Sequence, residues 1–386
     1  MGILITFLCL SGSFVFAQVL PEDPSRGGQL FISKGCVKCH ALNGVGGKIG
    51  PDLGRIDLGD TQLDLAGMIW NHAPSMNIEM GRAGMTKATL TGQEFTEISA
   101  YLYFLKFFEE PGKPTQGRSV FTEKGCHFCH QVSGKSKEGA PGLDEFPKNL
   151  SPAFLAQAIW NHSLEMMARM VETGMRWPKF RGTEMMDLLE YIKTKANAPE
   201  EIAFFKPGNP NEGKRVFTDK GCNQCHSIHG EGARGGVDLG KIAKTFYTSP
   251  SQIVSTMWNK GPTLLVRMAQ IQFGMNKFTS KEMVDLLAYL YFLHFIDEPG
   301  NTTNGKRLFS EMECSQCHAL EGRRGKLMYI DLSKYQNKPP TEIVASMWNH
   351  SAEIQKAVGE AGFPWPQFKR GEMGDLLEFM RNPEKR

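Results

Sequence analysis

The sequence lacks a strong net charge of either sign. Its 386 residues include 44 Lys and Arg against 41 Asp and Glu, which gives a formal net charge of +3 at pH 7. Proteins that bind nucleic acid usually carry a clear basic excess, so the composition indicates no nucleic-acid partner. The apolar content of 41% is ordinary for a globular chain, and the length allows two to four domains.

After residue 20 the sequence also lacks an apolar run long enough to span a membrane. The one such run is N-terminal and reaches Phe16. Val15 and Ala17 suit cleavage after Ala17, which predicts a signal peptide over residues 1–17. The alternative is a retained anchor, because the stretch from Ile3 to Leu20 is barely long enough to cross a bilayer. Both interpretations predict an exported protein, periplasmic or otherwise outside the cytoplasm, and either soluble or held by the uncleaved N-terminus.

Cysteine is almost confined to four short motifs. Of nine cysteines, Cys9 lies in the N-terminal run, and the other eight belong to four copies of Cys-x-x-Cys-His. No cysteine is left over for a disulfide framework. The motif residues are Cys36, Cys39 and His40; Cys126, Cys129 and His130; Cys222, Cys225 and His226; and Cys314, Cys317 and His318.

Cys-x-x-Cys-His is the attachment signature of c-type haem. The two thiols add across the vinyl groups of the porphyrin, and the histidine that follows becomes the proximal ligand of the iron. A zinc site would pair two such cysteine knuckles at a short fixed distance, whereas these copies stand 90, 96 and 92 residues apart. A thioredoxin-like redox pair or structural disulfides would leave the repeated histidine unexplained. The motifs therefore predict four covalent haems.

The surroundings of the motif are repeated as well. Each unit has a glycine and then an aromatic residue before the first cysteine, and later a Trp-Asn pair in a helical segment. A closing amphipathic helix follows, predicted over 91–108, 182–195, 279–296 and 371–381, with capping boxes at Thr91 to Glu94 and Thr279 to Glu282. The glycines are Gly27, Gly117, Gly213 and Gly305, the aromatics Phe31, Phe121, Phe217 and Phe309, and the tryptophans Trp70, Trp160, Trp258 and Trp348.

Linkers rich in Pro, Gly and polar residues separate the units. They divide the chain into residues 1–17 and four modules over residues 21–110, 111–206, 207–298 and 299–386. Modules of this size have small cores of their own. We expect each to fold largely independently around its haem.

Each module resembles a class I cytochrome c domain, on the strength of its haem motif, middle helix and closing helix. The Trp-Asn-His sequences and the Trp-Pro-x-Phe sequences (Trp177 to Phe180 and Trp365 to Phe368) are similar to a bacterial branch of that family. The resemblance covers residues 21–386. It implies an all-α fold of four tandem domains, each with a few helices around one haem c and its iron.

In this family a methionine before the last helix usually supplies the sixth iron ligand. Ten residues after the tryptophan stand Met80, Met170 and Met268, with Val358 in module four. A second set follows a glycine: Met85, Met175 and Met275, with Phe363 in module four. We assign the first set provisionally, beside the proximal ligands His40, His130, His226 and His318, and keep the second as the alternative. Core packing is the competing explanation for most of the twenty methionines.

Module four departs from the repeat. No methionine lies between Trp348 and its closing helix, so its iron could take His350, stay open, or recruit Met328 or Met347. His72 and His162 occupy the same position as His350 in modules that also have methionines. We therefore interpret that column as structural, for example as a partner of a haem propionate.

A loop proline offers a second comparison between the modules. Pro51 and Pro141 stand eleven residues after the haem histidine, and a proline carbonyl in this loop usually accepts a hydrogen bond from that histidine in the family. Modules three and four have no proline there. We therefore expect two standard modules and two that have drifted.

The sequence thus predicts an exported tetrahaem cytochrome that transfers electrons between redox partner proteins. Nothing in it supplies a nucleophile and base pair or a phosphate-binding loop, so an electron carrier is favoured over an enzyme. The alternative is a haem enzyme or a respiratory-complex subunit with one reactive haem in module four. Docking to a membrane respiratory complex is compatible with the carrier function.

Overall fold

The computed structural model describes residues 20, 24–105, 109–133, 140–148, 150–197, 208–246, 249–320 and 330–382. Residues 1–19, with the predicted signal peptide, lie outside the described residues. The described chain is helical apart from three pairs of two-residue strands. The predicted all-α class is therefore confirmed.

Each module repeats an opening helix of ten residues, a middle helix of 21 residues and a closing helix. The opening helices are α1 (Pro24–Ser33), α4 (Pro114–Glu123), α7 (Pro210–Asp219) and α11 (Thr302–Glu311). The middle helices are α2 (Gln62–Arg82), α5 (Pro152–Glu172), α9 (Pro250–Gln270) and α12 (Pro340–Glu360). The closing helices are α3 (Gly92–Phe104), α6 (Glu184–Lys193), α10 (Ser280–Phe292) and α13 (Glu372–Arg381).

Short elements fill the loops between these helices. Antiparallel pairs join β1 (Ala41–Leu42) to β2 (Val45–Gly46) and β3 (Ser227–Ile228) to β4 (Glu231–Gly232), and a parallel pair joins β5 (His318–Ala319) to β6 (Ile330–Asp331). The others are α8 (Leu239–Phe246) and the 3₁₀ turns η4 (Leu143–Glu145), η7 (Leu293–Phe295) and η9 (Ser333–Tyr335). The four predicted closing helices are all present. Both predicted capping boxes are confirmed, at the starts of α3 and α10.

The opening and closing helices of each module cross at a glycine. A Cβ atom added to Gly27, Gly117, Gly213 or Gly305 would lie only 1.9 to 2.0 Å from a backbone oxygen of the closing helix. These oxygens belong to Glu97, Asp187, Asp285 and Asp375. The repeated glycine is therefore required for the two backbones to touch.

The aromatic residue one turn after this glycine is buried beside the same crossing. Phe31, Phe121, Phe217 and Phe309 are all at most 7% exposed. In the last three modules the ring packs against an aromatic of the closing helix, with centroids 5.7 to 5.8 Å apart. The two repeated residues thus fix the angle and spacing of the helices that carry the haem motif.

Replacing Gly117 with alanine should destabilise module two by about 1 to 3 kcal/mol, because a methyl group there must push two backbones apart. Thermal unfolding of the holoprotein measures this. The matched control is Gly359→Ala in α12, where an added Cβ meets no atom within 4 Å. That substitution should be neutral or stabilise the chain by about 0.5 to 1 kcal/mol, because alanine is the better helix former. Equal effects of the two substitutions would contradict the close crossing.

The modules form two pairs through their middle helices. Module two pairs with module three, and module one pairs with module four. We call the contact between modules two and three the 2–3 seam: α5 packs on α9 and α10. Trp177 stacks on Trp258 with ring centroids 4.4 Å apart and donates from Nε1 to the Trp258 carbonyl at 3.0 Å. Asn259 exchanges two hydrogen bonds of 2.9 Å with the backbone of Phe180, and Asn161 does the same with Phe278.

The contact between modules one and four, the 1–4 seam, repeats this arrangement with α12 packed on α2 and α3. Trp365 stacks on Trp70 at 4.4 Å and donates to its carbonyl at 3.1 Å. Asn71 pairs with the backbone of Phe368, and Asn349 pairs with the backbone of Leu90, at 2.8 Å in each bond. The Trp-Asn pairs therefore join modules to each other, so the modules are in contact as well as connected by linkers. Independent folding of each module stays a prediction.

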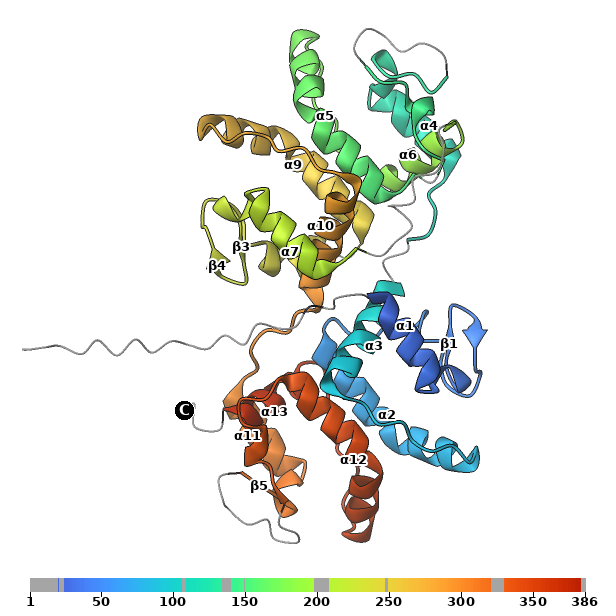
Figure 1. Ribbon diagram of the computed structural model, residues 1–386, viewed down its shortest axis with the longest axis vertical. Helices are drawn as coiled ribbons and strands as arrows, with labels where there is room; N and C mark the ends of the chain where they lie inside the picture. Colours follow the sequence, from blue (N-terminus) through green and yellow to red (C-terminus); the bar gives the residue numbers. More distant parts are fainter. Residues whose placement is uncertain are drawn as a thin grey trace, which may run out of the picture.

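Figure 1 shows the two pairs as two halves, with α5, α9 and α10 in one and α2, α3 and α12 in the other. The halves meet where α3 and η7 approach each other. Tyr103 stacks on Phe295 with centroids 3.8 Å apart, and the Tyr291 hydroxyl donates to the Tyr103 carbonyl at 3.0 Å. All three rings are at most 8% exposed. The four modules therefore form one assembly in which module one contacts module three as well as module four.

Lys87 places a charge inside the 1–4 seam. Its Nζ lies 4.2 Å from the centroid of the Trp348 ring and donates to the Trp348 carbonyl at 2.5 Å. Burial lowers the pKa of Lys87 to about 8, against a partly compensating attraction to Glu353. The position corresponds to Met275 in the 2–3 seam, since both stand 17 residues after the tryptophan of their module.

Because the folded pKa of Lys87 is lowered from 10.5 to about 8, the folded state loses this proton before the unfolded state does. The unfolding free energy should therefore rise between these two pH values, relative to a Lys87→Met variant, by about 1 kcal/mol after allowance for solvent screening. Denaturant unfolding across this pH range measures the difference, with Lys369→Met on the exposed surface as the control. Parallel pH profiles for the parent and Lys87→Met would contradict a buried charge in the seam.

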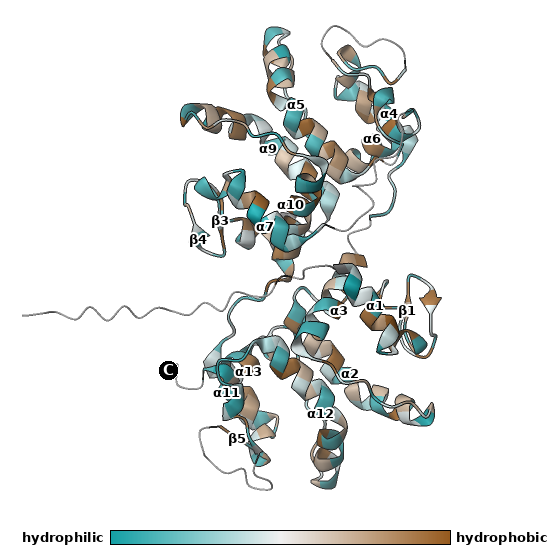
Figure 2. Cartoon of the chain, in the orientation of Figure 1, coloured by the Kyte–Doolittle hydropathy of each residue, from teal (hydrophilic) through white to brown (hydrophobic). Residues whose placement is uncertain are grey.

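None of the described helices is long and apolar enough to cross a membrane. Figure 2 shows hydrophilic and hydrophobic residues side by side along the middle helices. This mixture fits helices that bury one face in a seam and leave the other in water.

Candidate functional site

The four Cys-x-x-Cys-His motifs share one local structure. The first cysteine of each motif begins a 3₁₀ turn, and the second follows its end. The turns are η1 (Cys36–Lys38), η3 (Cys126–Phe128), η6 (Cys222–Gln224) and η8 (Cys314–Gln316). In module one the amide of His40 donates to the Cys36 carbonyl at 3.0 Å, and modules two and three have the same bond at 2.9 Å. The turn thus returns the histidine to the side of the first cysteine.

The residue before each turn has a left-handed backbone. It is glycine in three modules, Gly35, Gly125 and Gly221, with φ between 78° and 82°. In module four it is Glu313 with φ of 60°. A side chain is unfavourable in this region, so the glycines explain why the same sharp entry to the motif recurs.

The eight motif cysteines form no disulfide with one another or with any other described residue. Burial raises the pKa of the first cysteine in each motif, to about 11 for Cys36, Cys126 and Cys222 and to about 12 for Cys314. Two cysteines and the histidine that follows them are the set of residues that thioether attachment of haem c uses.

The proximal histidines are held in one tautomer. Nδ1 of His40 lies 3.0 Å from the Pro51 carbonyl oxygen, and Nδ1 of His130 lies 3.0 Å from that of Pro141. A carbonyl only accepts, so Nδ1 carries the proton and Nε2 keeps its lone pair for a metal. Burial also lowers the pKa of His130, which favours the neutral ring.

Module three has the same bond without the proline. Nδ1 of His226 lies 2.9 Å from the carbonyl oxygen of Val237. The expectation that module three has drifted at this point is therefore wrong, because the bond needs a carbonyl and not a particular side chain. The corresponding loop of module four, residues 321–329, lies outside the described residues.

The family comparison agrees with this geometry. The cytochrome c family model matches the chain four times, over residues 24–106, 114–196, 210–293 and 302–383. The chain belongs to the cytochrome c family. No curated protein and no solved structure shows a significant match.

Cytochrome c domains bind haem c covalently, with iron as its metal. The residues of this chain fit that group: each motif presents two thiols in one turn, and the three histidines described above keep Nε2 available. The proximal ligands of the cytochrome c modules would be His40, His130, His226 and His318.

The first methionine set lies at the end of the middle helices. Met80, Met170 and Met268 are all half-buried in the last turn of α2, α5 and α9. Their carbonyl oxygens accept bonds of 2.8 to 2.9 Å from the amides of Met85, Met175 and Phe273. The ligation of iron by Met80, Met170 and Met268 stays a prediction.

The second methionine set is shifted in module three. The left-handed residue after the middle helix is Gly84, Gly174 or Gly362 in the other cytochrome c modules, but it is Gln272 in module three, with φ of 53°. The residue that follows is therefore Phe273, and it faces Gly221 as Met85 faces Gly35 and Met175 faces Gly125. Phe273, and not Met275, therefore corresponds to Met85 and Met175, and the sequence-based grouping on Gly274 is wrong by two residues in module three.

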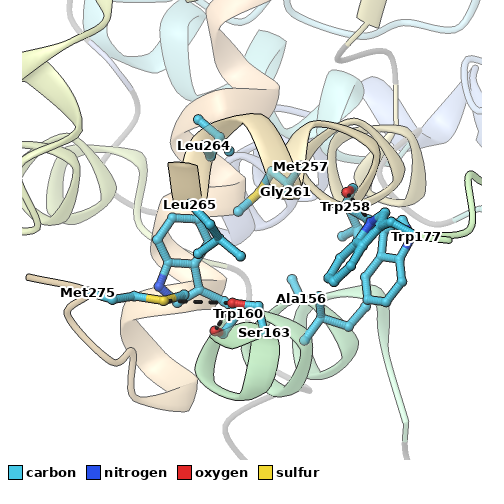
Figure 3. A pocket seen from close by; sticks show the side chains of 12 residues that line it. Ala156, Trp160, Ser163, Trp177, Met257, Trp258, Gly261, Leu264, Leu265 and Met275 are labelled. Carbon is cyan, nitrogen blue, oxygen red and sulfur yellow. Dashed lines mark hydrogen bonds between the residues drawn. The ribbon is translucent and has the colours of Figure 1, made fainter. Parts of the chain in front are cut away.

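Met275 consequently lies in the 2–3 seam. Its sulfur is 3.7 Å from the Ser163 hydroxyl of α5. Figure 3 shows it at the edge of an apolar pocket between α5 and α9, with Trp160, Trp177, Trp258, Leu264 and Leu265. This placement gives Met275 a role in module pairing and leaves module three with Met268 as its predicted ligand.

Proposed function

We propose that the chain is an exported tetrahaem cytochrome that carries electrons between redox partner proteins. The observation that supports this most strongly is the fourfold repetition of a complete attachment motif within four cytochrome c modules. When bound, each haem supplies a reversible one-electron couple between ferric and ferrous iron.

The chain's own residues hold and tune these groups. The two cysteines of each motif fix the porphyrin to one turn, so that it stays in place in both oxidation states. The carbonyls of Pro51, Pro141 and Val237 accept the Nδ1 proton of the proximal histidines, which fixes the ring and makes Nε2 a better donor. The seams bring the modules into contact in pairs, which favours transfer within each pair.

Export is inferred from chemistry and sequence together. In bacteria, haem c is attached outside the cytoplasm, and the apolar run before Ala17 suits a signal peptide or an anchor. The partners would then be redox proteins of the same compartment, and a membrane respiratory complex is one that this location allows.

A spectroelectrochemical titration of the purified holoprotein tests the carrier function. It should show reversible reduction by four electrons per chain, followed by reoxidation with an added small electron-transfer protein. Haems that bind but cannot be reduced and reoxidised reversibly would contradict electron transfer.

Module four supports a second candidate, a reactive haem. It has no methionine between Trp348 and α13, and His350 is exposed on α12. An iron without a sixth protein ligand would be high-spin and open to small molecules. A haem enzyme of this kind would take electrons from the other three modules.

His350→Ala should leave the spectrum of haem four nearly unchanged, because the exposed imidazole is not expected to reach the iron. The measurement is the ferric magnetic spectrum with and without cyanide, which should bind readily to one haem in four in both proteins. Lys356→Met, at an exposed residue of the same helix, is the matched control. Loss of a low-spin signal in His350→Ala alone would identify His350 as the ligand and exclude the open haem.

A further inference from the structure

The sixth ligand of haem two is where the structure departs furthest from the methionine pattern. His162 lies on α5, two residues after Trp160, and its side chain is 29% exposed. Its ring centroid lies 6.3 Å from that of the proximal His130, with an angle of 68° between the ring planes. Two histidines of module two, one in the haem motif and one on the middle helix, thus lie at a defined separation.

This separation matches two imidazoles on opposite sides of one metal ion. A metal–imidazole bond is about 2.0 Å long, which puts the centroids of two axial rings about 6.3 Å apart. An edge-to-face contact between two packed rings has a similar separation, so the ligand pair and the packed pair are distinguished by the spectra described below. The planes of axial imidazoles both contain the metal–nitrogen axis and are free to rotate about it, so an angle of 68° is compatible with ligation.

Both rings also have their second nitrogen engaged. Nδ1 of His130 lies 3.0 Å from the Pro141 carbonyl, and Nδ1 of His162 lies 3.5 Å from Oε2 of Glu165. A carboxylate or carbonyl on Nδ1 is the usual outer partner of a metal-bound histidine, because it leaves Nε2 as the donor. Nε2 is therefore the nitrogen that each ring keeps available for a metal.

The methionines of module two do not compete from the same position. Met170 lies eight residues beyond His162 on α5, about 12 Å further along the helix axis. Met166, one turn beyond His162, packs against the hydrophobic core. Met175 lies beyond the end of α5, with its methyl group beside Gly125. A straight helix that brings His162 to His130 cannot also bring Met170 there.

The other members of this column are placed differently. His72 is exposed, and its Nδ1 lies 3.2 Å from the Met68 carbonyl of its own helix. His350 and Lys260 are exposed as well. Of the described residues in this column, His162 is half-buried and lies beside the proximal histidine of its module.

We propose that His162 is the sixth iron ligand of haem two, which makes that haem bis-histidine-ligated in place of the predicted Met170. This deepens the proposed electron-transfer function and rests on it. A second imidazole lowers the reduction potential relative to a thioether. Haem two is then the lowest-potential low-spin haem of the chain and the last of these to accept an electron.

The test uses the full-length holoprotein and its ferric magnetic and near-infrared spectra, with haem content fixed by intact mass. The parent should show one low-spin component with the bis-imidazole signature. His162→Ala should convert one haem in four to high-spin, and added imidazole should restore the low-spin signal. His162→Met should convert the same component to a thioether-ligated one with a higher potential. Met170→Leu and His72→Ala are the controls and should leave this component unchanged.

Two results would overturn the proposal: a parent spectrum without any bis-imidazole component, or loss of the haem-two low-spin signal in Met170→Leu with His162→Ala unchanged. The ferric spectra of the parent protein test the proposal even if His162→Ala fails to mature. Failure of the proposal leaves four reducible haems intact, whereas failure of the carrier function would appear as haems that cannot be reduced and reoxidised. The two failures are therefore distinguishable.

Discussion

Replacing Cys126 and Cys129 together with alanine should leave a protein with three haems and an unfolded second module. The module has a small core around the crossing of α4 and α6, and a covalently held porphyrin supplies the large apolar face that such a core lacks. Loss of module two should also expose Trp258 and Asn259 of module three, which have their partners across the 2–3 seam. Intact mass and far-ultraviolet circular dichroism measure the two effects.

The matched control lies inside the same motif. Phe128 stands between the two cysteines and is 51% exposed. Phe128→Ala should therefore keep four haems and the parent's helix content. If the double cysteine variant still carried four haems, the attachment chemistry assigned to these residues would be wrong.

Replacing Trp177 with alanine should separate modules two and three locally. The substitution removes the stack on Trp258 and the hydrogen bond to its carbonyl. Truncation of a buried tryptophan costs about 3 to 5 kcal/mol, and we expect about 2 to 3 kcal/mol at this half-buried site. Hydrogen exchange should accelerate in α5 and α9 and stay at the parent's rate in α2 and α12.

Two further variants make this test specific. Trp177→Phe keeps an aromatic ring but loses the donor, so its effect should be intermediate. Val171→Ala, at a residue of α5 that is 73% exposed, should leave exchange unchanged. Unchanged exchange of α5 and α9 in Trp177→Ala would show that the 2–3 seam contributes little to their stability.

The haem motifs and the helices around them could be predicted from the sequence because their causes are local. Cys-x-x-Cys-His carries its own chemistry, and Thr91 and Thr279 form their capping boxes with residues three positions away. The sequence shows that a glycine recurs at the position of Gly117 in every module. The structure explains why, since the backbone there lies against the Asp187 carbonyl and leaves no room for a side chain.

The seams could not be predicted in this way, because the partners are distant in sequence. Trp70 donates to the carbonyl of Pro366, 296 residues away. The sequence does contain a pattern that distinguishes the two members of each pair. Trp-Pro-x-Phe occurs in modules two and four, whereas the described closing helices with capping boxes belong to modules one and three. Complementary features of this kind indicate that unlike modules pair.

The methionine sets show a different limit. In modules one and two a glycine in the left-handed conformation ends the middle helix, but in module three Gln272 takes this position. Gly274 lies two residues later. Comparing the modules by their glycines therefore grouped Met275, a residue of the 2–3 seam, with Met85 and Met175. The histidine column was interpreted as structural because His72 and His162 occur in modules that also have methionines, and sequence spacing does not show that His162 lies close to His130.

The central claim is that one chain carries four covalent haems in four cytochrome c modules. The mass of the fully matured protein, measured under denaturing conditions that remove every non-covalent group, tests this most directly. We expect a mass that exceeds that of the processed polypeptide by four haem groups. A fully matured protein with three haems or fewer would contradict it.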